Sequence, residues 1–299
     1  MSISGQSTVI WGEVLWDLFP DGPQLGGAPA NVAWHLGLAG GWARLVSRVG
    51  DDELGHRAIS RLSEVCDTSL IQIDPSRQTG VVEVAVFDGE PSYRLVPGRA
   101  WEHIICANEV HDAIEEASVF VYGTLAQHTA GGLAAWRIAV GAANERCVKV
   151  CDVNLRKTER APASERTAAL EGLDHADVVK LNDRECGMLA SWFGWSDPIA
   201  ELQNRRRVIA LTHGERGATL FGAGEPIQIA GEPAQPGGDH VGCGDAFLAI
   251  FVHGMTLGWD LRRCGQAACR WAATVAQARG ATPRLDTERV AELLGEYAR

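Results

Sequence analysis

Short apolar runs rich in β-branched residues alternate along the chain with longer stretches that carry apolar residues at helical spacing. The strand-like runs lie at residues 8–16, 43–49, 118–123, 147–153, 176–181 and 207–212, and the clearest helical stretches at 28–40 and 129–143. Apolar runs without alternation are typical of strands buried on both faces, as in a parallel sheet. Strands separated by helices indicate an α/β protein. The sequence therefore predicts a mostly parallel central sheet flanked by helices.

Residues 70–97 depart from this alternation. They contain three strand-like runs in succession without a helix, and Asp88-Gly89 is a typical hairpin turn. The runs alternate apolar and polar residues, as in a sheet with one face in water. We expect a small β-sheet formed mainly by residues 70–97 plus part of 12–25, within a single domain that spans 1–299. This sheet could be a lid, a dimer surface or both, or a surface meander without a function.

Charge and composition exclude several classes of protein. The 299 residues include 27 Lys plus Arg and 38 Asp plus Glu, which gives a net charge of −11 without any basic run. We therefore expect neither nucleic acid nor an anionic membrane as a partner. No positive stretch precedes an apolar one near residue 1, and no uncharged run reaches ~18 apolar residues. These features predict a cytoplasmic protein without a signal peptide or a membrane span.

The eight cysteines are scattered, and no Cys-x-x-Cys occurs. None of the close pairs has a histidine at the spacing of a zinc site. We expect buried, reduced thiols and no disulfide framework.

A glycine-rich turn, Gly242-Cys243-Gly244-Asp245, precedes the almost wholly apolar stretch 246–257. A helix that starts here would offer unpaired N–H groups and a partial positive charge, and glycines would let an anion approach the backbone closely. Such a turn suits phosphate oxygens, or a transition state whose oxygens carry negative charge. Asp245 could accept a proton from an attacking hydroxyl, or could simply cap the helix.

Other phosphate-binding motifs are missing from the sequence. No Gly-x4-Gly-Lys-[Ser/Thr] occurs, and the turn at 242–245 lacks the third glycine of the dinucleotide fingerprint. A nucleotide would have to bind by another route.

Polar residues also mark the ends of several predicted elements. Asn31 lies in the first turns of a helix that follows Gly26-Gly27, where it could bind a ligand hydroxyl or be satisfied by nearby backbone. Apolar strand-like runs end at three further polar residues: Asp17, Asn154 and Asn182. Because ligands of open α/β sheets gather at the carboxyl ends of strands, these residues are candidates for a ligand site.

Six motifs in order resemble the ribokinase-like (PfkB) carbohydrate kinases. They are GGAPANVAWHLGLAGG, SRVGDDELG, DVNLR, KLNDRE, THGERGA and GCGDAF, and the resemblance runs from Gly12 to about residue 285. Within that family the chain looks most like bacterial fructokinases, whose glycine pair is typically followed by Ala-Pro-Ala-Asn, as at residues 28–31 here. The resemblance implies a ribokinase-like α/β fold and an ATP-dependent kinase.

The resemblance also implies roles for single residues. Asp245 would be the catalytic base, and the backbone of residues 242–244 would form an anion hole. Family members usually have alanine where this chain has Cys243, whose thiol could be reactive or inert. The sugar would be held by a substrate-binding set: Asp17, Gly27, Asn31 and Arg99.

For the nucleotide, the resemblance implies contacts by Asn182, Thr212, Gly214, Gly217 and Gly244. Asn154 and Arg156 would lie near the transferring phosphate, although Arg156 could equally form a surface salt bridge. Asn182 and Glu185 match the motif that organises Mg²⁺ and phosphate through water, and the same spacing fits a helix capping box.

Two departures from the family bear on ligands. Where the family often has Asp-Thr-Thr, this chain has Asp239-His240-Val241, so the sequence does not decide whether a monovalent cation binds there. His240 could be a solvated loop residue or a catalytic one. No cation follows the glycine pair at residues 28–30, so a buried phosphate would lack a partner unless Arg94 or Arg99 supplied one.

We therefore expect a neutral sugar, fructose first, as the substrate. Another sugar, a sugar acid or a nucleoside remains an alternative, as does a non-catalytic sugar-binding regulator on the same fold. The small sheet could also mediate a homodimer.

Overall fold

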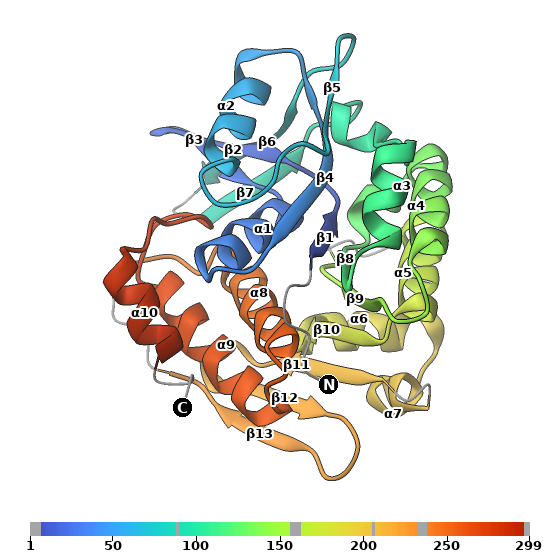
Figure 1. The fold of residues 1–299 in the computed structure, drawn as a ribbon, viewed down its shortest axis with the longest axis vertical. Helices are drawn as coiled ribbons and strands as arrows, with labels where there is room; N and C mark the ends of the chain where they lie inside the picture. Colours follow the sequence, from blue (N-terminus) through green and yellow to red (C-terminus); the bar gives the residue numbers. More distant parts are fainter. Residues whose placement is uncertain (1–6, 88–89, 156–162, 205–206, 233–237, 296–299) are drawn as a thin grey trace.

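A large twisted sheet organises the computed structural model, which describes residues 7–87, 90–155, 163–204, 207–232 and 238–295 (Figure 1). Its nine strands follow the order β13-β12-β11-β10-β9-β8-β1-β4-β5 in the described residues. All pairs from β11 to β5 are parallel, whereas β12 and β13 form an antiparallel edge. The mostly parallel α/β sheet predicted from the sequence is confirmed.

The strands of the large sheet are β1 (Thr8–Trp11), β4 (Ala43–Gly50), β5 (Ile71–Asp74), β8 (Val119–Tyr122), β9 (Val148–Asp152), β10 (Val178–Asn182), β11 (Val208–Thr212), β12 (Gly217–Phe221) and β13 (Ile227–Ala230). The α-helices are α1 (Ala28–Leu38), α2 (Glu53–Leu62), α3 (Asn108–Glu115), α4 (Ala130–Ala142), α5 (Ala163–His175), α6 (Asp183–Phe193), α7 (Pro198–Gln203), α8 (Cys243–Thr256), α9 (Leu261–Val275) and α10 (Thr287–Gly295). Short 3-10 helices are η1 (Ala100–His103), η2 (Leu125–Gln127) and η3 (Gly214–Arg216).

Helices cover both faces of this sheet. Helices α1, α8 and α9 lie on one side and α3, α4 and α5 on the other (Figure 1). One apolar cluster includes Trp34 of α1 and Phe251 of α8, and a second includes Phe120 of β8 and Trp136 of α4. The cysteines are free thiols, and no helix in the described ranges is long and apolar enough to cross a membrane.

A second, smaller sheet has four strands in the order β3-β2-β6-β7. They are β2 (Leu15–Phe19), β3 (Gly22–Gly26), β6 (Gly80–Phe87) and β7 (Glu90–Leu95). Strands β6 and β7 pair antiparallel up to Phe87 and Glu90, while the predicted turn Asp88-Gly89 lies outside the described residues.

Two boundaries expected from the sequence are wrong. Residues 71–74 pair with β4 in the large sheet, so the small sheet does not begin near residue 70. The single strand-like run 8–16 is split between the sheets, because the backbone breaks at Gly12 with φ 151°. A Cβ at Gly12 would lie only 2.4 Å from Pro29 Cγ, so this turn requires glycine.

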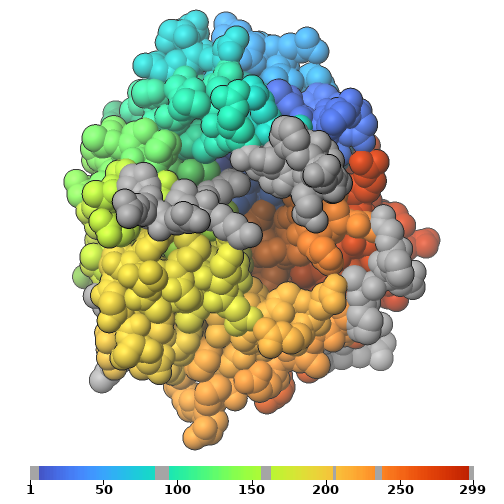
Figure 2. All heavy atoms as spheres, turned by 180° about the vertical axis from the view of Figure 1, so that it is seen from behind, coloured from blue at the N-terminus to red at the C-terminus, as the bar shows by residue number. Residues whose placement is uncertain are grey.

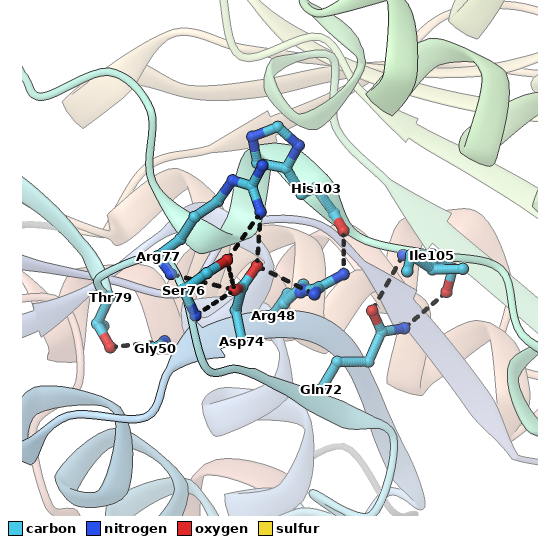
Figure 3. A network of polar contacts seen from close by, with 9 residues as sticks. All are labelled: Arg48, Gly50, Gln72, Asp74, Ser76, Arg77, Thr79, His103 and Ile105. Atoms are coloured by element: carbon cyan, nitrogen blue, oxygen red, sulfur yellow. Dashed lines mark hydrogen bonds and ion pairs between the residues drawn. The ribbon is translucent and has the colours of Figure 1, made fainter.

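A polar network joins β4 and β5 of the large sheet to the segments that lead into and out of β6 and β7 (Figure 3). Asp74 ends β5 with a fully buried side chain, and its Oδ1 accepts N–H groups of Ser76 and Arg77 at 2.9 and 3.0 Å. Its Oδ2 lies 3.0 Å from Arg48 Nη2, and Arg48 Nη1 donates to the His103 carbonyl at 2.9 Å. The carboxylate thus connects β4, β5 and the segment that follows β7.

Thr79 makes the next connection. Its hydroxyl donates to Asp52 Oδ1 at 2.7 Å and accepts the N–H of Gly50 at 3.0 Å, and its own N–H donates to Asp52 Oδ2 at 2.8 Å. These bonds fix the point where the chain enters the small sheet at Gly80.

We expect Asp74→Asn to lower the free energy of unfolding by about 3 kcal/mol, because it leaves the buried end of Arg48 without a charged partner. Burial alone would raise the pKa of Asp74, but the bonds from Ser76 and the charge of Arg48 hold this pKa well below its usual value. The stabilising contribution is therefore present at neutral pH and is lost as the pH falls below about 4. Urea unfolding measures the effect, with Asp51→Asn on the exposed surface as the control. Equal stability of the two variants would contradict this role.

Candidate active site

Two adjoining cavities form one cleft between the sheets and helix α8. The smaller, about 380 Å³, lies beside the small sheet, and the larger, about 570 Å³, lies beside β10 to β12. Four residues line both: Lys180, Asn182, Arg184 and Gly244. Figure 2 shows the hollow, with orange residues of the C-terminal part at its floor. The volumes are typical of sites for small ligands.

The N-terminus of α8 lies where the two cavities meet. Its N-cap is Gly242, with φ 76° and no side-chain capping bond, and a Cβ there would lie 2.5 Å from the Cβ of Ala281. The helix begins at Cys243, within the turn 242–245 where the sequence placed its start, so Asp245 is its third residue. The simple reading of Asp245 as a helix cap is therefore not supported, and the start of the helix faces the cleft.

Asp245 lies in the first turn of α8, and its Oδ2 accepts a hydrogen bond from Asn31 Nδ2 at 2.7 Å. Burial raises the pKa of Asp245 to about 7, although Lys180 opposes this shift. A carboxylate whose pKa lies near neutral pH can accept a proton efficiently from a ligand hydroxyl.

Lys180 in the middle of β10 was not singled out from the sequence. Its Nζ lies 2.9 Å from Asp152 Oδ1, and its side chain is 5% exposed. Burial lowers the pKa of Lys180, but Asp152, Glu185 and Asp245 together hold it above its usual value, so the amine stays charged. A Cβ at Gly244 would lie 2.9 Å from this Nζ, which places a fixed positive charge against the start of α8. The sequence feature that could have identified Lys180 is a lysine inside the otherwise apolar run VVKL.

On the small-sheet side, the cavity is lined by Asp17, Gly27 and Asn31. The sequence suggested that Asp17 ends the first strand. In the structure Asp17 lies in the middle of β2. Asn31 Oδ1 is buried without a hydrogen-bond partner in the described structure, so the amide has one acceptor left for a ligand. Glu13, also missed from the sequence, is 2% exposed and accepts the N–H of Ala28 at 3.3 Å beneath Gly27.

The larger cavity is lined by Thr212, Gly214 and Gly217, three of the residues to which the family resemblance assigns nucleotide contacts. Asp183 lines this cavity and holds the turn at 213–216, because its oxygens lie 2.7 Å from His213 Nδ1 and 2.7 Å from Arg216 Nη2. Asn154 lines the smaller cavity and has φ 36°, a strained value for a residue other than glycine.

Asn182 and Glu185 form the capping box at the start of α6. Asn182 Oδ1 accepts the N–H of Glu185 and Glu185 Oε2 accepts the N–H of Asn182, both at 2.9 Å. Burial raises the pKa of Glu185, and Lys180 opposes the shift. Both residues also line the cleft, and Asp152 Oδ2 beside them is buried without a hydrogen-bond partner in the described part of the chain. These oxygen donors fit a hard cation such as Mg²⁺.

Several predicted residues are not brought into the cleft. Arg99 does not line either cavity and bonds to Gln78 instead. Arg94 pairs with Glu83, which lies on the opposite face of the small sheet from Asp17, because Asp17 is in register with Val82.

Three further residues discussed from the sequence are Arg156, His240 and Cys243. Arg156 lies outside the described residues. His240 lines the larger cavity with a side chain that is 73% exposed, as expected for a solvated loop residue. Burial raises the pKa of the Cys243 thiol to about 12, which indicates an inert thiol.

Comparison with known families agrees with this geometry. The family model of the pfkB family carbohydrate kinases matches residues 23–288. The chain belongs to the PfkB family. It is therefore a carbohydrate kinase with a ribokinase-like fold, and the family resemblance read from its motifs is confirmed.

Relatives of this PfkB kinase are modestly similar. The uncharacterized sugar kinase PH1459 from Pyrococcus horikoshii is 30% identical over 279 residues, which cover 87% of this chain and 84% of that protein. Its structure in complex with ATP has a TM-score of 0.79 over 96% of this chain and 97% of that one. Fructokinase-1 from Zea mays is 28% identical over 272 residues, or 84% of each chain. The fructokinase from Xylella fastidiosa with bound ATP shares the fold, with a TM-score of 0.84 at 22% identity over 98% and 99% of the chains.

Proposed function

We propose that this PfkB kinase transfers the γ-phosphoryl group of ATP to a hydroxyl of a small neutral sugar, with fructose as the first candidate. The observation that carries the proposal is the position of Asp245, between Asn31 of the smaller cavity and Lys180 at the junction of both cavities. The sugar would occupy the smaller cavity and ATP the larger one. Relatives named as an ATP-bound sugar kinase and a fructokinase support this assignment.

The side chains suggest how the reaction proceeds. Asp17 and Asn31 orient the sugar, and Asp245 accepts the proton of the attacking hydroxyl. The N–H groups at the start of α8 and the amine of Lys180 stabilise the negative charge on the transferring phosphoryl oxygens. The small sheet acts as a lid that excludes water from this reaction. Positioning and charge neutralisation supply most of the catalysis in this class.

Magnesium would be held by Glu185, directly or through water, with Asn182 beside it. When bound, it would neutralise charge on the phosphate oxygens of ATP. The remaining chemistry belongs to the protein side chains described above.

Glu185→Gln separates the magnesium role from the capping role. The amide keeps an oxygen for the N–H of Asn182, so the fold should persist, but it binds a hard cation more weakly. We expect the magnesium concentration for half-maximal rate to rise by roughly tenfold. Magnesium titrations at saturating ATP measure this change, with Glu109→Gln on α3 as the control. If the Glu185 variant had a normal magnesium titration and only a lower melting temperature, Glu185 would cap the helix without holding magnesium.

A neutral sugar is favoured by the charges around the smaller cavity. Its lining cations, Lys180 and Arg184, lie on β10 and α6, on the side assigned to ATP. The described lining residues of β2 and α1 carry no positive charge, and Arg94 is on the far face of the small sheet. A sugar phosphate would lose its hydration without gaining a cationic partner there.

We therefore expect kcat/KM for fructose to exceed that for fructose 6-phosphate by at least ~100-fold. ADP release with Mg-ATP should be measured for both at equal concentration, and for other hexoses, pentoses, sugar acids and nucleosides. A preference for fructose 6-phosphate would refute the neutral-sugar proposal, and a preference for a sugar acid or nucleoside would move the enzyme to that substrate class.

A further inference from the structure

A separate cavity, of about 320 Å³, lies behind the small sheet and shares no lining residue with the cleft. Strands β2 and β3, helix α2 and the segment after α9 enclose it. Trp16 and Leu25 supply an apolar wall, on the face of the small sheet that points away from Asp17. Three arginines also line this rear cavity: Arg57, Arg61 and Arg279.

Among the described residues, three arginines and no acidic residue line the rear cavity, in a chain with a net charge of −11. Each arginine has an acidic neighbour, since Arg57 lies 3.8 Å from Glu53, Arg61 lies 3.6 Å from Glu64, and Arg279 lies 2.9 Å from Asp21. None of these carboxylates lines the cavity, and its described lining contains no Asp or Glu. A ligand inside would therefore contact three arginine side chains, and each of their acidic partners lies outside the cavity lining.

Two of the guanidinium groups are held in place by tryptophans. Arg57 lies over the ring of Trp16 at 5.0 Å, and Arg61 lies over the ring of Trp34 at 4.2 Å. Arg61 also donates to the carbonyl of Thr282 at 3.1 Å. Stacking on a ring restricts a guanidinium but leaves its edge accessible, and the long, exposed pair of Arg57 with Glu53 leaves the edge of Arg57 ready for an anion.

The segment that closes the rear cavity also supports the anion hole. The N–H of Gly280 donates to Asp239 Oδ2 at 3.0 Å, and Ala281 packs against Gly242, the N-cap of α8. The carbonyl of Ala281 lies 2.9 Å from His35 Nε2 on α1. A ligand that ordered residues 279–282 would therefore act on the start of α8 from behind.

We propose that the rear cavity is a regulatory site for a compact organic anion with two or more negative charges, a phosphate ester or a polycarboxylate. Its charged groups would bind Arg57, Arg61 and Arg279, and its carbon frame would lie against Trp16 and Leu25. The volume suits a ligand of about the size of a hexose phosphate. Binding would hold residues 279–282 against the small sheet and so stabilise the anion hole.

Calorimetric titration of the full chain with glucose 6-phosphate and with citrate tests the site. Saturating Mg-ADP and fructose should both be present, so that neither cavity of the cleft is available to the titrated anion or to glucose. We expect one anion per chain and at least ~10-fold weaker binding by the Arg57→Ala/Arg279→Ala double variant, because two charge-assisted contacts are lost. Glucose should give no signal, and Arg94→Ala, which removes an arginine on the same face of the small sheet outside the cavity, should bind normally.

Equal binding by the double variant, or binding that appears only without Mg-ADP and fructose, would overturn the proposal. Because Arg57 and Arg279 are exposed at the surface, the double variant should keep its fold, and the milder Arg57→Gln/Arg279→Gln pair guards against misfolding. The regulatory part predicts that the bound anion changes kcat/KM for the sugar at least ~2-fold in the wild type and not in the double variant. An unchanged kcat/KM at saturating anion would refute regulation.

Discussion

Asp245→Asn is expected to lower kcat by ~10²–10⁴-fold while sugar and nucleotide still bind, because the amide keeps the size of the carboxylate but cannot accept the proton. Its oxygen can still accept the hydrogen bond from Asn31. Turnover should be measured together with calorimetric binding of ADP and sugar. Asp112→Asn on the exposed surface of α3 is the matched control and should be fully active. Near-normal turnover of the Asp245 variant would remove this residue from the mechanism.

The same assignment predicts a pH dependence. Asp245 must be deprotonated to act as a base, and its pKa is raised to about 7 by burial. In the wild type, kcat/KM should therefore be constant at alkaline pH and fall tenfold per pH unit well below about 7. The residual activity of the asparagine variant should lack this acid limb. An acid limb centred near 4, the usual range of an exposed carboxyl, would contradict the environment described for Asp245.

Lys180→Met is expected to lower kcat/KM by ~10²–10³-fold, because it removes the fixed positive charge beside the start of α8. The loss should have a second signature. Lys180 lowers the pKa of Asp245 against the effect of burial, so without it the acid limb of kcat/KM should move to higher pH. This shift separates an electrostatic role from a merely structural one, which would lower stability and leave the limb in place.

Lys149→Met, at a partly exposed lysine on β9, is the control for the loss of a lysine. The Lys180 variant should be compared with it in melting temperature and in ADP binding. If the Lys180 variant had a normal kcat/KM and the acid limb of its pH profile were unchanged, the amine would serve only to neutralise the charge of Asp152.

The sequence was sufficient to predict the parts of the site that depend on local pattern. The glycine turn at 242–245, the polar strand ends at Asn154 and Asn182, and the glycine pair before α1 all lie in the cleft or at its edge. Each combines a residue type with an element boundary, and element boundaries at the same edge of a parallel sheet come together by topology.

The features that sequence reading missed depend on contacts between distant segments. Lys180 meets Asp152, which is 28 residues away in the chain, and nothing near either residue predicts that pair. Asp17 was expected at the end of the first strand but lies within the small sheet, because the chain passes from one sheet to the other at Gly12. Residues 71–74 alternate apolar and polar residues like an outer strand, and a strand at the edge of the large sheet has the same pattern as one in the small sheet.

The most direct test of the central claim is the stoichiometry of the products. The purified chain should be incubated with limiting Mg-ATP and excess fructose, and ADP and fructose phosphate should be quantified separately over time. A sugar kinase with Asp245 as the base and a water-excluding lid should form the two products in a 1:1 ratio, with negligible ADP when fructose is omitted. ADP formation without sugar phosphate, or at the same rate without sugar, would contradict the account.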